Sequence, residues 1–242
     1  MLSRLIKFET KNLIRDRMTL MLLAMPVLIG WLGKTLIENN LFDLAYANHM
    51  IIIALTLITG VFFGSMAGFS ILDDRDDHVF VSIQISPMDI KAYVWFKVLY
   101  VYVLSVIGTL VIFAMVGGMG LTWIEILAIA LLGALQAPMN AFLVNAFASN
   151  KVEGFVAMKA SGFLMIFPII STLFLDWKAW LFAIAPAFWG AKAVQRVLLE
   201  EAITSGAISM PLSFWGYVSL GLVYNLVLTG FMYTVFKRKY LN

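Results

Sequence analysis

The 242-residue sequence contains no cysteine and few charged residues. The absence of cysteine excludes disulfides, thiolate metal sites and cysteine nucleophiles. Charged residues make up 13% of the chain, about half of the roughly 25% that is typical of soluble domains. This shortage excludes an ordinary soluble enzyme, a disordered chain and a nucleic-acid-binding protein. The net charge of +3 reflects basic residues at chain ends and loops, a pattern typical of membrane topology.

The chain is instead rich in apolar residues, which form 62% of it, and its mean hydropathy is +0.93. A single soluble core cannot hide so much apolar surface. About 20 residues of helix cross the hydrocarbon layer of a bilayer. The sequence therefore predicts an all-α polytopic membrane protein, with one transmembrane domain over residues 1–242 in contact with membrane lipid. Six transmembrane helices are expected at about 18–37, 48–72, 98–117, 126–148, 155–175 and 213–236.

Two further segments are expected to contact the membrane without crossing it. Residues 1–17 place several leucines and isoleucines on one face and basic residues elsewhere, which favours an amphipathic interfacial helix. The alternative is a basic tail that only sets orientation. Lys178 and Lys192 bracket 13 uncharged residues with Pro186 in their middle. This stretch is too short to cross, so a re-entrant outer segment is predicted at about 179–200, before the last span.

The distribution of basic residues predicts the orientation. An even number of spans places both termini on one side of the membrane. With that side in the cytoplasm, 13 of the 17 basic residues lie inside, as the positive-inside rule requires. The residues expected outside are Lys34, Lys178, Lys192 and Arg196. We therefore expect a multi-pass protein of the cell membrane, of the bacterial cytoplasmic type, with both termini cytoplasmic.

The sharpest local feature is the connection between the second and third spans, at about 73–90. Four carboxylates end a hydrophobic helix, and a short run of mixed apolar and polar residues follows until a Ser-Pro pair. The pattern favours a short cytoplasmic helix parallel to the membrane, which another protein could bind. The alternative is a solvated charged loop that only blocks further insertion. The candidate interface residues are Asp73, Asp74, Asp76, Asp77, His78, Phe80, Ile83, Ser86 and Pro87.

This order of features resembles the permease subunit of type-2 ABC exporters. The acidic end of span two, the short amphipathic segment, Ser86-Pro87 and Lys97 carry the resemblance. The amphipathic start and the broken outer segment with Ala185-Pro186-Ala187-Phe188-Trp189 extend it over most of the chain. In one respect the chain departs from the family, whose members commonly have a glycine soon after the acidic pair, where this chain has His78-Val79.

The resemblance implies a transport subunit that has no ATPase site and binds no cofactor itself. A separate ABC ATPase subunit would use ATP and Mg and dock on the segment 73–90, which is the coupling helix in that family. A second permease copy or a paralogue would complete the unit. The implied substrate is a drug, an antimicrobial peptide or another amphiphile, and export of sodium or of a lipid-linked glycan stays open.

Small and polar residues within the spans allow two interpretations each. Gly60, Gly64 and Gly68 line one helical face, which serves close helix packing or a face toward a partner permease. The amides Gln136, Asn140 and Asn145 either join helices or contact substrate. Hydroxyl residues either line a translocation path or bond their own helix backbone. These path candidates are Thr56, Thr59, Ser161, Ser171 and Thr172.

Enzymatic motifs are incomplete. The segment Gly30–Thr35 lacks the first glycine of a phosphate-binding loop, since Leu28 stands there. With two histidines and no H-E-x-x-H motif, a zinc protease is excluded and no metal site is expected. Glu200-Glu201 lie outside the spans, without a histidine beside them. An intramembrane enzyme is therefore disfavoured, and the main rival hypothesis is an ATPase-independent small channel or membrane assembly factor.

Overall fold

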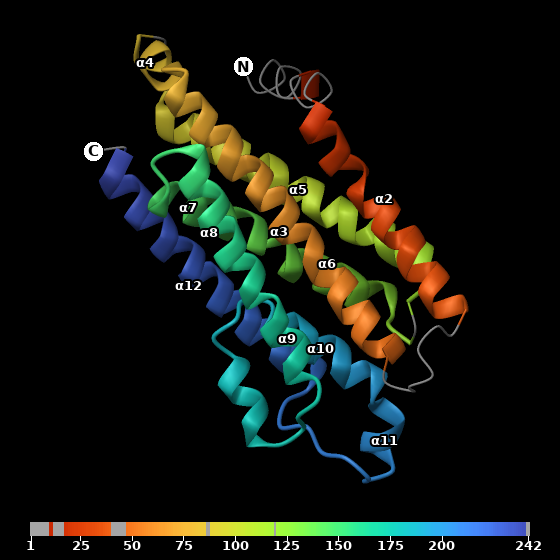
Figure 1. Ribbon diagram of the computed structural model, residues 1–242. Coiled ribbons are helices and arrows are strands. Elements are labelled where there is room, and N and C mark those ends of the chain that lie inside the picture. Colours follow the sequence, from red (N-terminus) through yellow and green to blue (C-terminus); the bar gives the residue numbers. More distant parts are fainter. Residues whose placement is uncertain (1–9, 12–16, 40–46, 86–87, 119, 241–242) are drawn as a thin grey trace.

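The computed structural model describes residues 10–11, 17–39, 47–85, 88–118 and 120–240. Within this part of the chain all regular structure is helical. Six helices or helix pairs are long and apolar enough to cross a membrane, which confirms the predicted all-α fold with six spans (Figure 1). They are α2 (Arg17–Glu38), α3 (Ala47–Asp76), α5 (Ile90–Val116), α6–α7 (Trp123–Ala134 and Gln136–Phe147), α8–α9 (Lys151–Leu164 and Ile166–Ser171) and α12 (Phe214–Tyr240).

Shorter elements lie at the two ends of the bundle. At one end α4 (Val79–Gln84) joins α3 to α5. Figure 1 shows that α2 begins and α12 ends at this same end. Toward the other end lie the 3₁₀-helix η1 (Trp177–Phe182), α10 (Phe188–Leu198) and α11 (Glu200–Thr204). The predicted interfacial helix over 1–17 lies almost entirely outside the described residues.

Two helices extend beyond their predicted bounds at the α4 end. Helix α3 continues past the predicted residue 72 to Asp76, and α5 begins at Ile90 rather than at 98. The Asp89 side chain caps α5 by accepting a hydrogen bond from Lys91 N at 3.1 Å. The prediction began α5 too late because it took Lys97 to mark the membrane edge. The structure buries this lysine against a carboxylate inside the helix pair.

Prolines divide the fourth and fifth spans near their middles. A proline ring clashes with the carbonyl of the fourth preceding residue. For Pro138 that residue is Ala134, where α6 ends. For Pro168 it is Leu164, where α8 ends. Each span resumes one residue later as a second helix, so each is a broken rather than a continuous helix.

The segment predicted as re-entrant folds back into the bundle. After η1 the chain turns at Pro186, and α10 packs against α12, α3, α6 and α9. Residues Phe188 to Gln195 are all buried. Asn225, close to the middle of α12, donates a hydrogen bond from Nδ2 to Pro186 O at 3.1 Å. The turn before α10 therefore lies about as deep in the bundle as the middle of the last span.

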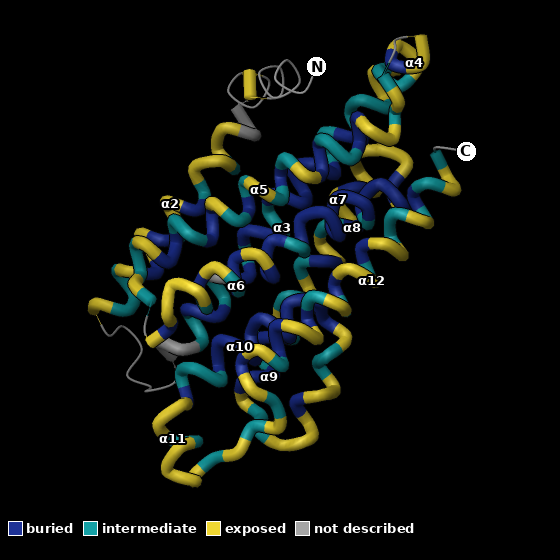
Figure 2. Tube along the Cα trace, turned by 180° about the vertical axis from the view of Figure 1, so that it is seen from behind, coloured by how far each residue is buried: buried dark blue, intermediate teal, exposed yellow. Residues whose placement is uncertain are grey.

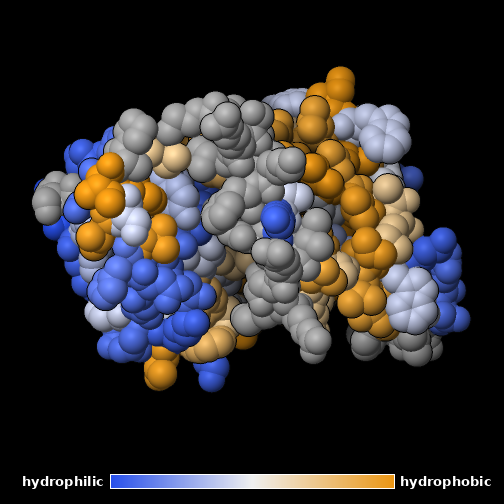
Figure 3. All heavy atoms as spheres, turned by 90° about the horizontal axis from the view of Figure 1, so that it is seen from above, coloured by the Kyte–Doolittle hydropathy of each residue, from blue (hydrophilic) through white to orange (hydrophobic). Residues whose placement is uncertain are grey.

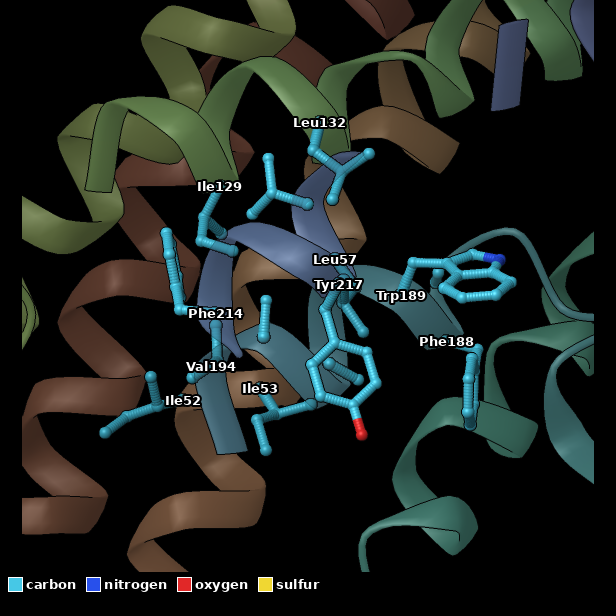
Figure 4. Close-up of a cluster of buried hydrophobic side chains, with 14 of the residues drawn as sticks. Ile52, Ile53, Leu57, Ile129, Leu132, Phe188, Trp189, Val194, Phe214 and Tyr217 are labelled. Atoms are coloured by element: carbon cyan, nitrogen blue, oxygen red, sulfur yellow. The ribbon is translucent and has the colours of Figure 1, made fainter. Parts of the chain in front are cut away.

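The buried core runs along α3, α5, α6–α7 and α10, and one face of α12 packs against it, while α2 and the other face of α12 are exposed (Figure 2). In the most apolar 18-residue stretch of α6–α7, 78% of the residues are buried, whereas in that of α12 22% are buried. Apolar side chains exposed on α2 and α12, such as Trp31 and Val227, are those that would face lipid. One buried cluster joins α3, α6, α10 and α12 around Ile53, Leu132 and Tyr217 (Figure 4).

Candidate functional site

A buried ion pair joins the two helices that flank α4. Lys97 Nζ on α5 contacts Asp74 Oδ2 on α3 and donates to Ser70 Oγ at 2.8 Å. Tyr93 OH donates to the same Asp74 oxygen at 3.0 Å. The Lys97 side chain is 6% exposed. Because a buried charge needs a partner, this network holds the end of α3 against the start of α5. These two helix ends, with α4 between them, form a rigid hairpin, which we call the α4 hairpin.

The network corrects one prediction about the four carboxylates. All four were expected in an interface for another protein, but Asp74 points into the hairpin. Asp73 forms an ion pair with Lys151 Nζ at 2.9 Å. Asp76 and Asp77 are exposed. These two, together with Asp89 at the start of α5, are the exposed carboxylates beside α4 that form no ion pair within the described residues.

Helix α4 presents a different apolar face from the predicted one. Of the predicted contact residues, Ile83 is buried and Phe80 is half-buried against the hairpin. Val81 and Ile85 instead point outward, with exposed fractions of 58% and 91%. Figure 3 shows hydrophilic residues gathered on the α4 side of this end, with hydrophobic ones among them. Ser86 and Pro87 lie outside the described residues.

His78 starts α4 in a backbone conformation that glycine adopts more readily. Its φ is 56° and its ψ is 24°, the left-handed region, which costs an ordinary L-residue about 1–2 kcal/mol. Val81 N and Ser82 N both donate to His78 O, at 3.1 and 3.3 Å. The turn that His78 makes starts α4.

We expect His78→Gly to stabilise the start of α4 and His78→Val to weaken it, since a β-branched residue tolerates positive φ worst. The amide hydrogen exchange of Val81 and Ser82 reports the effect. His78→Gly should slow exchange by up to about tenfold, which corresponds to about 1.4 kcal/mol. Faster exchange in His78→Gly than in His78→Val would contradict the strain.

The glycine stripe of α3 packs inside the chain. A Cβ built on Gly60 would lie 2.6 Å from Gly133 O, and one on Gly64 would lie 2.6 Å from Ala137 O. One on Gly68 would lie 3.0 Å from Val144 Cβ. All three glycines thus face α6–α7 of the same protein. The contacts support the packing interpretation and leave this face no room for a partner permease.

The hydroxyl residues proposed for a translocation path do not share one surface. Thr59 Oγ1 lies 2.7 Å from Thr109 Oγ1 between α3 and α5. Ser171 and Thr172 donate to the backbone oxygens of Pro168 and Ile169, both at 2.6 Å. The structure does not describe the side chain of Thr56. Ser161 is buried elsewhere, without a hydrogen-bond partner.

Ser161 lies in a small pocket with the amides of α7. The pocket lies where the broken spans and the re-entrant turn meet, and Gln136, Asn140 and Pro186 line it. Asn145 is different, because its Nδ2 donates to Gly68 O on α3 at 2.9 Å. The sequence placed Gln136 and Asn140 on one helix, but it gave no signal that Ser161 and Pro186 meet them.

Lys192 holds the re-entrant segment in place, a role that the sequence did not predict. Its Nζ donates to Ser171 O, Phe174 O and Gln195 Oε1 at 2.7–2.8 Å. It thereby caps the last carbonyl of α9, Ser171 O, where a cation is favoured. Burial lowers the pKa of Lys192 to about 8, and the Asp176 carboxylate offsets part of that effect.

We expect Lys192 to make stability depend on pH above about 8. The folded chain releases this proton near pH 8, whereas the unfolded chain keeps it to about 10.5. Stability therefore rises with pH between these values, because there the unfolded state binds more protons. Thermal unfolding of detergent-solubilised protein measures it. Lys192→Met should lose this component of the slope and be less stable at pH 7, and an unchanged slope would contradict the assignment.

The described residues hold no group of three or more His, Asp or Glu side chains able to bind a metal. What the structure defines is a multi-pass membrane protein. It has a hairpin held by a buried ion pair at one end, broken spans and a re-entrant segment.

Comparison with known proteins gives the family. The family model "Fluoroquinolones export permease protein Rv2686c-like" matches residues 9–233, and the chain belongs to this family. It is 25% identical over 245 residues to the fluoroquinolones export permease proteins Rv2686c and MT2760, from two strains of Mycobacterium tuberculosis. The alignment covers 96% of this chain and 92% of each relative. No solved structure matches the chain significantly.

The family confirms the prediction that the chain is an export permease. It also agrees with the resemblance to type-2 ABC permeases, which rested on the order of motifs. The chain is thus a multi-pass transport protein of an export family.

Proposed function

We propose that the chain is the membrane-spanning permease subunit of an ATP-driven ABC exporter. It moves an amphiphilic compound out of the cytoplasm, and a separate subunit hydrolyses the ATP. The relatives are named for export of fluoroquinolones, which supports an aromatic amphiphile of that kind as substrate. The proposal places α4 in the cytoplasm, where the ATPase binds it. Because α2 begins and α12 ends at the same end of the bundle as α4 (Figure 1), both termini are then cytoplasmic as well.

The observation that carries the proposal is the α4 hairpin. Two exposed carboxylates, Asp76 and Asp77, stand beside two exposed apolar side chains, Val81 and Ile85. Exposure of these two aliphatic side chains to water is unfavourable. An apolar centre with a charged rim is typical of a protein interface. The Asp74–Lys97 pair below it is suited to transmit a push on α4 to α3 and α5.

ATP binding can drive transport only if the nucleotide-bound and free ATPases prefer different permease shapes. In this proposal the ATPase grips α4, and the rigid hairpin moves as one unit. The glycine stripe couples α3 to α6–α7, so a displacement of α3 reaches the middle of the bundle. A second permease copy or a paralogue would form the other half of the translocation path.

Reversing the exposed charges tests the proposal. In Asp76→Lys/Asp77→Lys, we expect loss of co-purification with the ATPase encoded beside the gene, and loss of ATPase stimulation. The matched control is Glu200→Lys/Glu201→Lys, which reverses two exposed charges on α11 at the opposite end. The proposal fails if both variants retain the ATPase, or if the purified chain alone transports without one. The second result would favour the channel hypothesis.

A further inference from the structure

Three interruptions of regular backbone meet at one point in the bundle. They are the break between α6 and α7, the break between α8 and α9, and the turn at Pro186 that precedes α10. One pocket touches all three, through Gln136, Met165 and Pro186. At membrane depth, non-helical backbone is tolerated where it is buried in protein or lines a cavity. The coincidence of three breaks at one pocket needs a reason beyond packing.

The pocket contains buried polar atoms without partners. Gln136 Nε2, Asn140 Nδ2, Asn140 Oδ1 and Ser161 Oγ make no hydrogen bond. The three residues have exposed fractions of 2%, 1% and 5%. A buried unpaired amide is costly, and such groups are nearly always satisfied in folded proteins. These atoms therefore point to a group that the protein binds.

The chemistry of the pocket selects a hydrogen-bond acceptor. Most of the unpaired atoms can donate, namely two amide N–H₂ groups and a hydroxyl, while Asn140 Oδ1 only accepts. No charged side chain lines the pocket. The N-terminus of α10, an 11-residue helix, begins beside Pro186 and Ala187, and its dipole places partial positive charge there. Val61, Leu164 and two methionines, Met139 and Met165, form the apolar wall. Methionine side chains adapt to varied apolar shapes.

The size of the pocket limits what can enter. The cavity volume is about 10 Å³, close to the minimum that holds one water molecule and far below the roughly 300–1,000 Å³ of sites that hold whole drug-sized ligands. In this conformation the pocket has room for no more than one polar atom, such as a carbonyl oxygen. The rest of a larger molecule would need the bundle to open along the breaks.

We propose that this pocket is a substrate-binding subsite that takes a carbonyl or carboxylate group of an otherwise apolar molecule, held by Gln136, Asn140 and Ser161. The proposal rests on the export function proposed above. The glycine stripe contributes to it, because Cβ atoms on Gly60 and Gly64 would lie within 2.9 Å of the Cβ atoms of Gln136 and Asn140. Small residues on α3 thus leave the room that these amide side chains occupy.

Equilibrium binding to the purified permease, without any ATPase, tests the subsite. The probes are a fluoroquinolone, which carries a ring carbonyl and a carboxylate, and its decarboxylated analogue, both followed by their fluorescence polarisation. Gln136→Met and Asn140→Leu remove the donors at nearly constant volume. Each should weaken binding of the fluoroquinolone at least tenfold. Thr229→Val removes a buried, unpaired hydroxyl on α12 that does not line the pocket, and it should bind within about twofold of the wild type.

Thermal unfolding of the same variants separates binding from structure. Because each substitution removes an unpaired buried amide, both should unfold at or above the wild-type temperature while binding falls. If the decarboxylated analogue binds the wild type as tightly as the parent, the ring carbonyl is the bound group. If it binds at least tenfold more weakly, the carboxylate is.

Wild-type protein that binds neither probe, or variants that bind as tightly as wild type, would overturn the subsite. Stabilised variants with unchanged binding would show that the pocket holds only buried water. These results leave the proposed function standing, because ATPase co-purification and its loss in Asp76→Lys/Asp77→Lys are measured independently.

Discussion

Asp74→Ala should lower the free energy of unfolding by about 3–5 kcal/mol, because it removes the carboxylate that forms an ion pair with the buried Lys97. Chemical or thermal unfolding of detergent-solubilised protein measures the change. Asp77→Ala is the matched control, since the exposed Asp77 should change stability by no more than about 0.5 kcal/mol.

The double variant Asp74→Leu/Lys97→Met completes the test. Replacing both members of a buried pair by apolar residues is often neutral or stabilising, so it should recover most of the loss. A single variant as stable as Asp77→Ala would show that Asp74 and Lys97 are not a desolvated pair. If the double variant is stable but fails to couple to the ATPase, the ion pair is needed for a rigid hairpin and not for folding.

Gly64→Ala should destabilise the bundle by about 1–3 kcal/mol or more, the usual cost of overpacking a core. The new Cβ would lie 2.6 Å from Ala137 O and 2.8 Å from Ala137 Cα. Backbone atoms cannot rotate away as a side chain can, so α3 and α7 must separate. Thermal unfolding in detergent measures the loss, and we expect export to fall with it.

Gly162→Ala is the control for this substitution. A Cβ on Gly162 in α8 meets no atom within 4 Å, and alanine favours a helix interior by roughly 0.5–1 kcal/mol over glycine. This variant should therefore be as stable as wild type or more so. If Gly64→Ala were equally well tolerated, α3 and α7 would not be in close backbone contact.

Much of the fold could be predicted because the bilayer imposes simple rules. Each span needs about 20 apolar residues, and the chain offers six such stretches. The start of α5 was harder to predict, because Lys97 was taken as the edge of that span. A charge inside a helix reads as the end of a span unless its partner is known, and Asp74 lies 23 positions away in the sequence.

The sequence placed the candidate interface in the connection between α3 and α5, and binding of another protein there stays a prediction. The acidic run located the hairpin, yet four carboxylates in five positions gave no indication that Asp74 points inward and Asp77 outward. That difference depends on where α5 packs. Similarly, the period of α4 did not decide whether Phe80 or Val81 faces solvent, because six residues present no strong amphipathic pattern.

The pocket and the Lys192 contacts were beyond sequence reasoning. Gln136 and Ser161 lie on different spans, and Pro186 lies on a segment that does not cross. Lys192 was taken as a charge at the outer surface, but it donates to the last carbonyl of α9, Ser171 O, and to Phe174 O in the turn that follows.

The sequence by itself determined that this protein has six spans, that an acidic connection joins two of them, and that glycines line one face of α3. These properties follow from composition and from spacing along one helix. The tertiary structure alone decided which charges are paired, which face the glycines meet and which polar atoms remain without partners. Pairing and burial depend on residues far apart in the chain, and only their arrangement in space sets the free energy of each contact.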